Sequence, residues 1–312
     1  MISKFIIKDI GLSIGRYGFG CAASGGHGWG EDTGQLAVEA IRVAFDNGID
    51  FFDTSDIYGL GVSEERLYSA LGDDRHKVVI ATKGGMYRDQ AQGRSVRDCS
   101  KKRLTSAVEY SLKRLRLETI PLYYAHWPDK ISTIEEIMGT LMGLRQEGKI
   151  QAIGLSNFSP EDVSRACKIG PVAAVQARLN LLMLDNAHNY LKLCQEHGII
   201  FVAWGGLCDG LLTGKYGIKA KFSTTDHRSR APHFQGRALI RNLEIVQQLG
   251  EVSKRLRVPL SSLALRALVH MYEKVCVLFG AKTPEQALQN CQDLNVPLSQ
   301  DVIARVRSIL YL

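Results

Sequence analysis

The sequence predicts a (β/α)8 TIM barrel, a closed ring of eight parallel β-strands that are each followed by an α-helix, with a short N-terminal β-hairpin. Two observations predict this fold class. Short apolar and β-branched runs alternate with amphipathic stretches along the whole chain. No Pro-, Gly- or Ser-rich linker and no change in composition divides its 312 residues, so we expect one domain over residues 1–312.

Eight short runs rich in Val, Ile, Phe, Tyr and Ala are the expected barrel strands. They are residues 17–22, 50–54, 78–83, 122–127, 152–157, 173–180, 199–205 and 275–281. A preceding segment, residues 5–13, is expected to form the small hairpin that plugs the bottom of the barrel.

The helices expected between the strands show apolar residues at helical spacing. They cover residues 36–46, 104–115, 133–146, 160–166 and 263–272. Gly48, Gly148 and Gly198 each stand just past a last helical turn, where glycine ends a helix. Ser159-Pro160 and Thr283-Pro284 pair an N-cap residue with proline, which marks a helix start.

A doubly wound dinucleotide-binding fold is the alternative, because Gly18, Gly20 and Ala23 match the spacing G-x-G-x-x-A. In that fold the glycines lead directly into a helix, and an acidic residue follows the second strand. Here residues 24–30 are glycine-rich and cannot open a helix directly, and no acid stands at the expected distance. The number of strands also favours the barrel.

The composition is that of an ordinary globular protein, with 45% hydrophobic and 23% charged residues. No apolar run approaches the ~20 residues that a membrane span needs, and the charged N-terminus lacks the apolar core of a signal peptide. The seven cysteines are scattered without CxxC spacing, which argues against a disulfide framework and a metal centre. We therefore expect a cytoplasmic protein with no membrane partner.

The positive charge, a net +7, is concentrated between residues 215 and 241. This segment has seven Lys and Arg residues, Arg228 among them, and Asp226 as its acid. It can hold phosphate groups; a solvated loop and helix face is the plain alternative. Nucleic-acid binding is disfavoured because no aromatic-interleaved motif accompanies the charge. The connection from about residue 208 to 234 is too long for an idle loop, which points to a functional role.

Four polar residues lie at or just after the ends of apolar runs, namely Asp53, Tyr58, Lys83 and His126. A phenol is too weak an acid to lose its proton near neutral pH, but a nearby lysine ammonium favours the phenolate. An aspartate held against the lysine keeps it charged, and a histidine can direct a carbonyl oxygen towards the phenol. Together the four residues predict a proton relay for carbonyl reduction.

Each of these residues also has a structural explanation when it is taken alone. His126 could be a buried structural histidine, Lys83 a solvated strand end, and Asp53 part of a turn or a helix cap. The functional interpretation is favoured because all four occur in one chain, at the ends of expected strands.

With these residues in hand, the chain resembles the aldo-keto reductase superfamily over almost its full length. The supporting segments are residues 48–59, 63–65, 154–158, 210–216 and 280–290. The resemblance implies a TIM barrel that binds NADP(H), without a Rossmann fold, at the C-terminal ends of its strands. It also implies that Tyr58 is the general acid, that Lys83 and Asp53 tune it, and that His126 orients the substrate.

The resemblance further implies a set of coenzyme-binding residues at the barrel mouth. Ser156, Asn157 and Gln176 would bind the nicotinamide carboxamide, Trp204 would stack on the ring, and Lys282 would receive the 2′-phosphate near a helix N-terminus. The full set is Gly20, Cys21, Asp53, Ser156, Asn157, Gln176, Trp204, Gly205, Leu207, Gly210, Lys215, Arg228, Gly280, Lys282, Gln286 and Asn290.

Some residues depart from the family pattern. Trp204, Gly205 and Gly206 stand where tyrosine, serine and proline are usual, so Gly205 offers no side-chain oxygen and Gly206 is expected to loosen the loop. Arg178 replaces a more usual acid and should place a cation in or beside the active-site wall. Because the chain ends soon after its last expected helix, we expect an open mouth.

The expected function is NADPH-dependent reduction of an aldehyde, ketone or sugar-like carbonyl in a small molecule, or the reverse alcohol oxidation. The alternative is a non-catalytic NADP-sensing auxiliary protein resembling potassium-channel β subunits, which also tolerate tryptophan at the stacking position. We expect no N-terminal extension of the kind that would dock on a channel, which disfavours this alternative. An isomerase or lyase on the same barrel would leave residues 280–290 without a use. The sequence identifies neither the substrate nor the oligomeric state, and a homo-oligomer is among the states that it allows.

Overall fold

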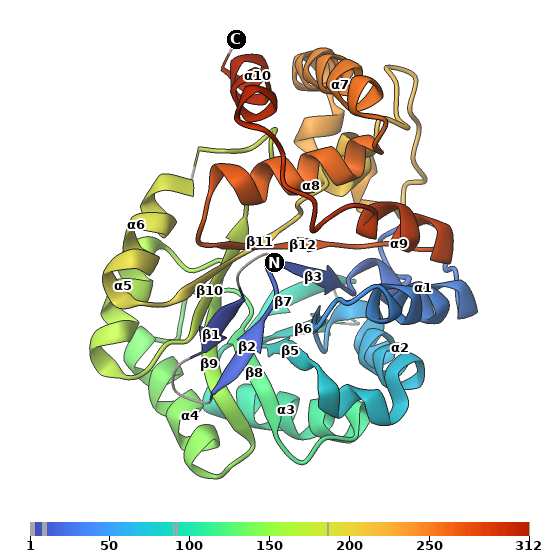
Figure 1. Cartoon of the computed structure of the whole chain (residues 1–312). Coiled ribbons are helices and arrows are strands. Elements are labelled where there is room, and N and C mark those ends of the chain that lie inside the picture. Colours follow the sequence, from blue (N-terminus) through green and yellow to red (C-terminus); the bar gives the residue numbers. More distant parts are fainter. Residues whose placement is uncertain (1–3, 8–10, 90, 92, 186, 312) are drawn as a thin grey trace.

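The computed structural model describes residues 4–7, 11–89, 91, 93–185 and 187–311 of the chain. Its central feature is a closed barrel of eight parallel strands in the order β10-β11-β12-β3-β4-β5-β8-β9 (Figure 1). The strands are β3 (Tyr17–Gly20), β4 (Phe51–Asp53), β5 (Val79–Gly84), β8 (Ile120–Ala125), β9 (Ile150–Ser156), β10 (Ala174–Arg178), β11 (Ile200–Trp204) and β12 (Val275–Phe279). Each overlaps an expected strand, so the predicted barrel is confirmed and the open doubly wound sheet is excluded.

Helices surround the barrel (Figure 1). They are α1 (Gln35–Asp46), α2 (Val62–Leu71), α3 (Lys101–Leu115), α4 (Ile134–Gln146), α5 (Pro160–Ile169), α6 (Ala187–His197), α7 (Gly236–Leu256), α8 (Leu260–Met271), α9 (Pro284–Cys291) and α10 (Gln300–Leu310). The expected N-caps are confirmed, since Ser159 and Thr283 accept hydrogen bonds from the third helical residue of α5 and α9. None of the helices in the described part of the chain is long and apolar enough to cross a membrane.

The N-terminal hairpin closes one end of the barrel. Its strands β1 (Phe5–Ile7) and β2 (Leu12–Ile14) are antiparallel. Ile7 and Ile14 are buried in one apolar cluster with the strand residues that fill the barrel interior. Gly15, just after β2, donates to Asp50 before β4, which places the hairpin at the N-terminal ends of the strands. The expected plug is therefore confirmed, while residues 8–10 of its expected span lie outside the described residues.

The opposite end of the barrel carries two long connections. The first, between β5 and α3, contains the hairpin β6 (Met86–Asp89) and β7 (Arg94–Arg97), which the sequence did not predict. The second, between β11 and α7, contains the 3-10 turns η5 (Cys208–Thr213), η6 (His227–Arg230) and η7 (Pro232–Phe234). In this connection the rings of Tyr216, Phe222 and Phe234 pack edge to face with centroids no more than 5.5 Å apart. It is thus folded onto itself and does not extend as an open loop.

Candidate active site

A buried ion pair links the C-terminal ends of the neighbouring strands β4 and β5. Lys83 is wholly buried, and its Nζ donates to Asp53 Oδ1 and, at 2.9 Å, to the Thr54 carbonyl oxygen. The other carboxylate oxygen of Asp53 accepts from Gln176 Nε2 at 2.7 Å. Although burial lowers the pKa of Lys83, the Asp53 carboxylate and Tyr58 raise it overall, so the lysine stays charged.

Tyr58 and His126 lie beside this ion pair. Tyr58 begins the short turn Tyr58–Gly61, and its ring centroid is 5.2 Å from Lys83 Nζ. His126 directly follows β8, and its ring meets the Tyr58 ring edge to face with centroids 5.7 Å apart. Its Nδ1 lies 3.1 Å from Ser55 Oγ. The barrel therefore brings together all four residues that were expected to form the proton relay.

Burial and neighbouring charges set the protonation states of these groups. Burial raises the pKa of Tyr58, while the Lys83 ammonium lowers it; burial prevails, so the phenol is protonated near neutral pH. The expected effect of Lys83 has the right sign but is the smaller of the two. Burial, together with Lys83 and Arg97, lowers the pKa of His126 well below its usual value, so the imidazole is neutral.

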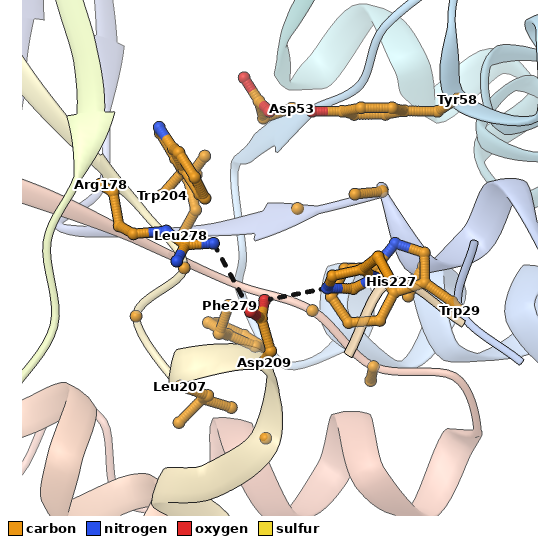
Figure 2. A pocket seen from close by; sticks show the side chains of 18 of the residues that line it. Trp29, Asp53, Tyr58, Arg178, Trp204, Leu207, Asp209, His227, Leu278 and Phe279 are labelled. Carbon is orange, nitrogen blue, oxygen red and sulfur yellow. Dashed lines mark ion pairs between the residues drawn. The ribbon is translucent and has the colours of Figure 1, made fainter. Parts of the chain in front are cut away.

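A cavity of about 630 Å³ opens beside the four residues at the barrel mouth (Figure 2). Nearly all expected coenzyme residues line it, namely Gly20, Asp53, Ser156, Asn157, Gln176, Trp204, Gly205, Leu207, Gly210, Lys215, Arg228, Gly280, Lys282, Gln286 and Asn290. Tyr58 and His126 line it too, while Lys83 is buried behind Asp53. Cys21 departs from the expectation: it is not in the wall, and its fully buried side chain packs in the layer between strands and helices.

One part of the cavity wall is cationic. Lys215 and Arg228 come from the long connection after β11, and Lys282 precedes α9. Lys282 Nζ donates to the carbonyl oxygens of Trp29 and Glu31 at 3.0 and 2.7 Å. Burial and the charges of Arg228 and Lys215 lower the pKa of Lys282. Because α9 begins beside Lys282, the helix N-terminus and the three cations make this part of the wall positive, with Arg228 paired to Asp226.

Polar side chains form a connected network in another part of the wall. Asn157, at a φ of 63°, donates through Nδ2 to the His126 carbonyl oxygen and to Ser156 Oγ. Its Oδ1 accepts from Trp204 Nε1 at 3.0 Å. The guanidinium of Arg178 lies 4.4 Å from the centre of the Trp204 ring system. The expectation that Arg178 places a cation in the active-site wall is confirmed, since it also lines the cavity.

Asp209 is a site residue that the sequence did not point to. Its nearly buried carboxylate lies 3.6 Å from His227 Nε2 and 3.5 Å from Arg178 Nη2 (Figure 2). It also lies 2.9 Å from His233 Nε2. Although burial raises it, the two histidines and Arg178 hold the pKa of Asp209 well below its usual range. His227 also contacts the Gly28 carbonyl oxygen through N and Nδ1. Asp209 thus helps to join the loop after β3, strand β10 and the long connection.

The signal for Asp209 was present but incomplete. It lies in the turn η5, near the start of the long connection that follows β11. Its partners, however, are 18 to 31 residues away in sequence, so their approach depends on how the connection folds.

The expectation for Gly206 was wrong. A β-carbon at this position would lie 2.7 Å from Val277 Cγ1 and 2.8 Å from the Leu278 carbonyl oxygen. Gly206 N also donates to that oxygen at 3.2 Å. The glycine therefore permits close packing against β12 and holds the loop in place. Gly205, at a φ of 73°, is the residue whose backbone conformation favours glycine.

Comparison with known proteins identifies the family. The model of the aldo/keto reductase family matches residues 16–311. The chain belongs to the aldo/keto reductase family. It is 35% identical over 283 residues to aldo-keto reductase YhdN of Bacillus subtilis (strain 168), covering 90% of this chain and 85% of that protein. It is also 31% identical over 302 residues to aldo-keto reductase yakc (NADP(+)) of Schizosaccharomyces pombe, covering 95% and 88%.

A solved structure agrees with this assignment. The glycerol dehydrogenase AKR11B4 of Gluconobacter oxydans superposes with a TM-score of 0.88 at 33% identity. The superposition covers 98% of this chain and 94% of that one. The present chain, as a member of the aldo/keto reductase family, is an oxidoreductase. Its TIM barrel extends over nearly all of the described residues.

Proposed function

We propose that the chain reduces the carbonyl group of an aldehyde, ketone or sugar-like small molecule with NADPH, or catalyses the reverse alcohol oxidation, with Tyr58 as general acid. The observation that carries the proposal is the position of protonated Tyr58, which lies between the buried Lys83–Asp53 pair and neutral His126. Tyr58 also lines a cavity that has a cationic region. A proton donor and an anion-binding region in one cavity are what this reaction requires. Residues 1–312 act in it as one domain.

The residues present fit a nicotinamide dinucleotide phosphate. The cavity volume of about 630 Å³ lies in the usual range for ligand pockets. Lys215, Arg228 and Lys282 would bind the phosphate groups, with the N-terminal amides of α9 beside them. Trp204 offers an aromatic face and Gln176 an amide at the end near Asp53. The family relative whose name specifies NADP(+) supports the same coenzyme.

The chemistry of the chain's own residues concerns the proton. The bound coenzyme supplies the hydride that reduces the carbonyl carbon. As negative charge develops on the carbonyl oxygen, Tyr58 gives it a proton, and the Lys83 ammonium stabilises the phenolate that remains. Asp53 holds Lys83 in place and keeps it charged. Because His126 is neutral and uses Nδ1 towards Ser55, its Nε2 is left to orient the substrate oxygen.

A coenzyme titration followed by a substrate panel tests the proposal. The purified chain is mixed with NADPH, and aldehydes, ketones and aldoses are added while the nicotinamide absorbance is followed. We expect saturable loss of NADPH with at least one carbonyl compound. Tight NADPH binding with no turnover across the panel would favour the non-catalytic NADP-sensing alternative instead.

Lys282→Ala should erase most of the preference for NADPH over NADH. A charge-assisted contact to a phosphate is worth about 1.5–3 kcal/mol, so the wild-type chain should bind NADPH at least roughly tenfold more tightly than NADH. The variant should weaken NADPH alone, since NADH has no 2′-phosphate. Dissociation constants from calorimetry measure this, with the exposed Lys219→Ala as a charge-matched control outside the cavity. Equal dissociation constants for both coenzymes in the wild type would contradict the role of Lys282.

Trp204 should report coenzyme binding through its fluorescence. A nicotinamide stacked on the indole alters its emission, so NADPH should quench tryptophan fluorescence saturably. Trp29 and Trp127 also line the cavity, so Trp204→Tyr is the necessary comparison. We expect most of the quench to disappear in that variant. A quench of unchanged size would place the nicotinamide away from Trp204.

A further inference from the structure

A second pocket, of about 180 Å³, lies beside the active site but outside its cavity. It is formed by one face of α3, the strand β6 and the turn between β4 and α2. Its lining residues are Asp56, Ile57, Leu60, Tyr87, Arg88, Arg103, Ala107, Tyr110 and Arg114. Ile57 lines both this pocket and the active-site cavity, so the two are separated by the residue just before Tyr58.

Three guanidinium groups line this pocket, and two of them are held in position by other residues. Arg114 Nε donates to Glu64 Oε2 at 2.6 Å, and Arg103 Nη2 donates to the Met86 carbonyl oxygen at 2.6 Å. Among the described residues, Arg103 Nε is buried without a hydrogen-bond partner. Arg88 on β6 makes no ion pair in the same part of the chain. The Arg88 guanidinium therefore gives the pocket donors that its own residues do not satisfy.

One carboxyl group, that of Asp56, lies at the buried end of the pocket. Its Oδ2 is 3.5 Å from Arg103 Nη2. Burial and the charge of Glu64 raise the pKa of Asp56 to about 7, against the opposing effect of Arg103 and Arg114. At neutral pH Asp56 is therefore only partly ionised. The positive charges of the three arginines therefore exceed the negative charges of Asp56 and Glu64, so the pocket has a net positive charge.

We propose that this pocket binds a small oxyanion, the carboxylate or phosphate group of a small molecule, through Arg88, Arg103 and Arg114. The planar guanidinium presents donors that match carboxylate and phosphate oxygens. The anion would accept hydrogen bonds from the Arg88 guanidinium, which has no ion-pair partner in the described part of the chain. The rings of Tyr87 and Tyr110 form apolar walls for the rest of the molecule.

Proton uptake by Asp56 on anion binding distinguishes this pocket from the coenzyme cavity. An anion placed beside Asp56 raises the pKa of that carboxyl further, so binding at pH 7 takes up protons and strengthens as the pH falls. The charged or titratable groups that face Asp56 are Glu64 from α2, Arg103 and Arg114 from α3, and Tyr123 from β8. Asp56→Asn should abolish the proton uptake while leaving binding itself in place.

Calorimetric titration of the full chain with inorganic phosphate, and separately with malonate, tests the proposal at constant ionic strength. Two buffers of different ionisation enthalpy measure the protons taken up. We expect saturable binding of at least one anion, and the tighter anion identifies phosphate or carboxylate as the preferred group. Because phosphate itself titrates near neutral pH, the proton uptake of Asp56 is the difference between the wild type and Asp56→Asn with the same anion. Arg88→Gln should weaken this binding at least roughly tenfold, because it removes one charge-assisted contact without breaking an ion pair.

The control variant is Lys102→Gln, which removes one charge from the exposed side of α3 next to Arg103. It should bind the anion as the wild type does. Anion binding that Lys282→Ala removes and Arg88→Gln leaves unchanged would place the anion in the coenzyme cavity and overturn the proposal. So would the absence of saturable binding for both anions, or equal weakening by Arg88→Gln and Lys102→Gln.

Discussion

Tyr58→Phe is expected to lower kcat for carbonyl reduction by roughly 10²–10⁴-fold while leaving the dissociation constant for NADPH nearly unchanged. The substitution removes the transferable proton and a single oxygen atom. The ring would keep its edge-to-face contact with His126 and its place beside Lys83. Steady-state kinetics on the best substrate of the panel, together with a coenzyme titration, measure the two effects separately.

A matched control for this variant is Tyr17→Phe. Tyr17 is buried at the start of β3, does not line the cavity, and its hydroxyl has no hydrogen-bond partner among the described residues. Removing that hydroxyl should change kcat little. If Tyr58→Phe reduced its best substrate at the wild-type rate, Tyr58 would not be the general acid. If both variants lost activity equally, the loss would reflect a general disturbance of the barrel.

Lys83→Met is expected to lower both stability and activity strongly. It leaves the Asp53 carboxylate buried with Gln176 as its remaining side-chain partner, and breaking a buried ion pair in this way costs about 3–5 kcal/mol of unfolding free energy. Urea denaturation measures this loss. Activity should fall because the phenolate that forms at Tyr58 loses the adjacent cation.

The pH dependence of Lys83→Met has a definite sign. Lys83 lowers the pKa of Tyr58 against the effect of burial, so its removal raises that pKa further. Reduction needs the protonated phenol and is lost as the pH rises through this pKa, so its alkaline limit should move to higher pH. Alcohol oxidation needs the phenolate, so at any fixed pH its rate should fall more than the rate of reduction.

The double variant Asp53→Asn/Lys83→Met separates stability from catalysis. It removes both buried charges, so most of the lost unfolding free energy should return while activity stays low. Recovery of activity together with stability would show that Lys83 acts only as a structural partner of Asp53.

The barrel and the proton relay could be predicted from the sequence because both depend on local patterns. A parallel strand that is buried on both faces needs a continuous apolar run, and β5 with its six buried residues is an example. Parallel strands in a closed barrel end at one mouth, so polar residues placed after such runs, as Asp53 and His126 are, must lie near one another. The caps at Ser159 and Thr283 are equally local, since each satisfies a backbone amide only three residues away.

Other features of the site were decided by the tertiary structure. The sequence showed that Lys83 favours the phenolate of Tyr58, but only burial determined that the pKa of Tyr58 is raised overall. Cys21 follows Gly20, the last residue of β3, yet its side chain packs with those of Tyr17 and Phe19 in the layer behind the wall. Gly206 was expected to loosen a loop, and contact with Val277 and Leu278 makes it a packing position.

The contacts of Asp209 and the second pocket were beyond the sequence for the same reason. Asp209, in the turn η5, meets Arg178 at the end of β10 and His233 within the folded connection. The hairpin that carries Arg88 approaches α3 only in the folded chain. The sequence by itself determined which residues end the strands and therefore which chemistry gathers at the barrel mouth. The tertiary structure decided the charge state of each group and the partner of each side chain, because desolvation and Coulomb energies depend on distances between residues that no local pattern contains.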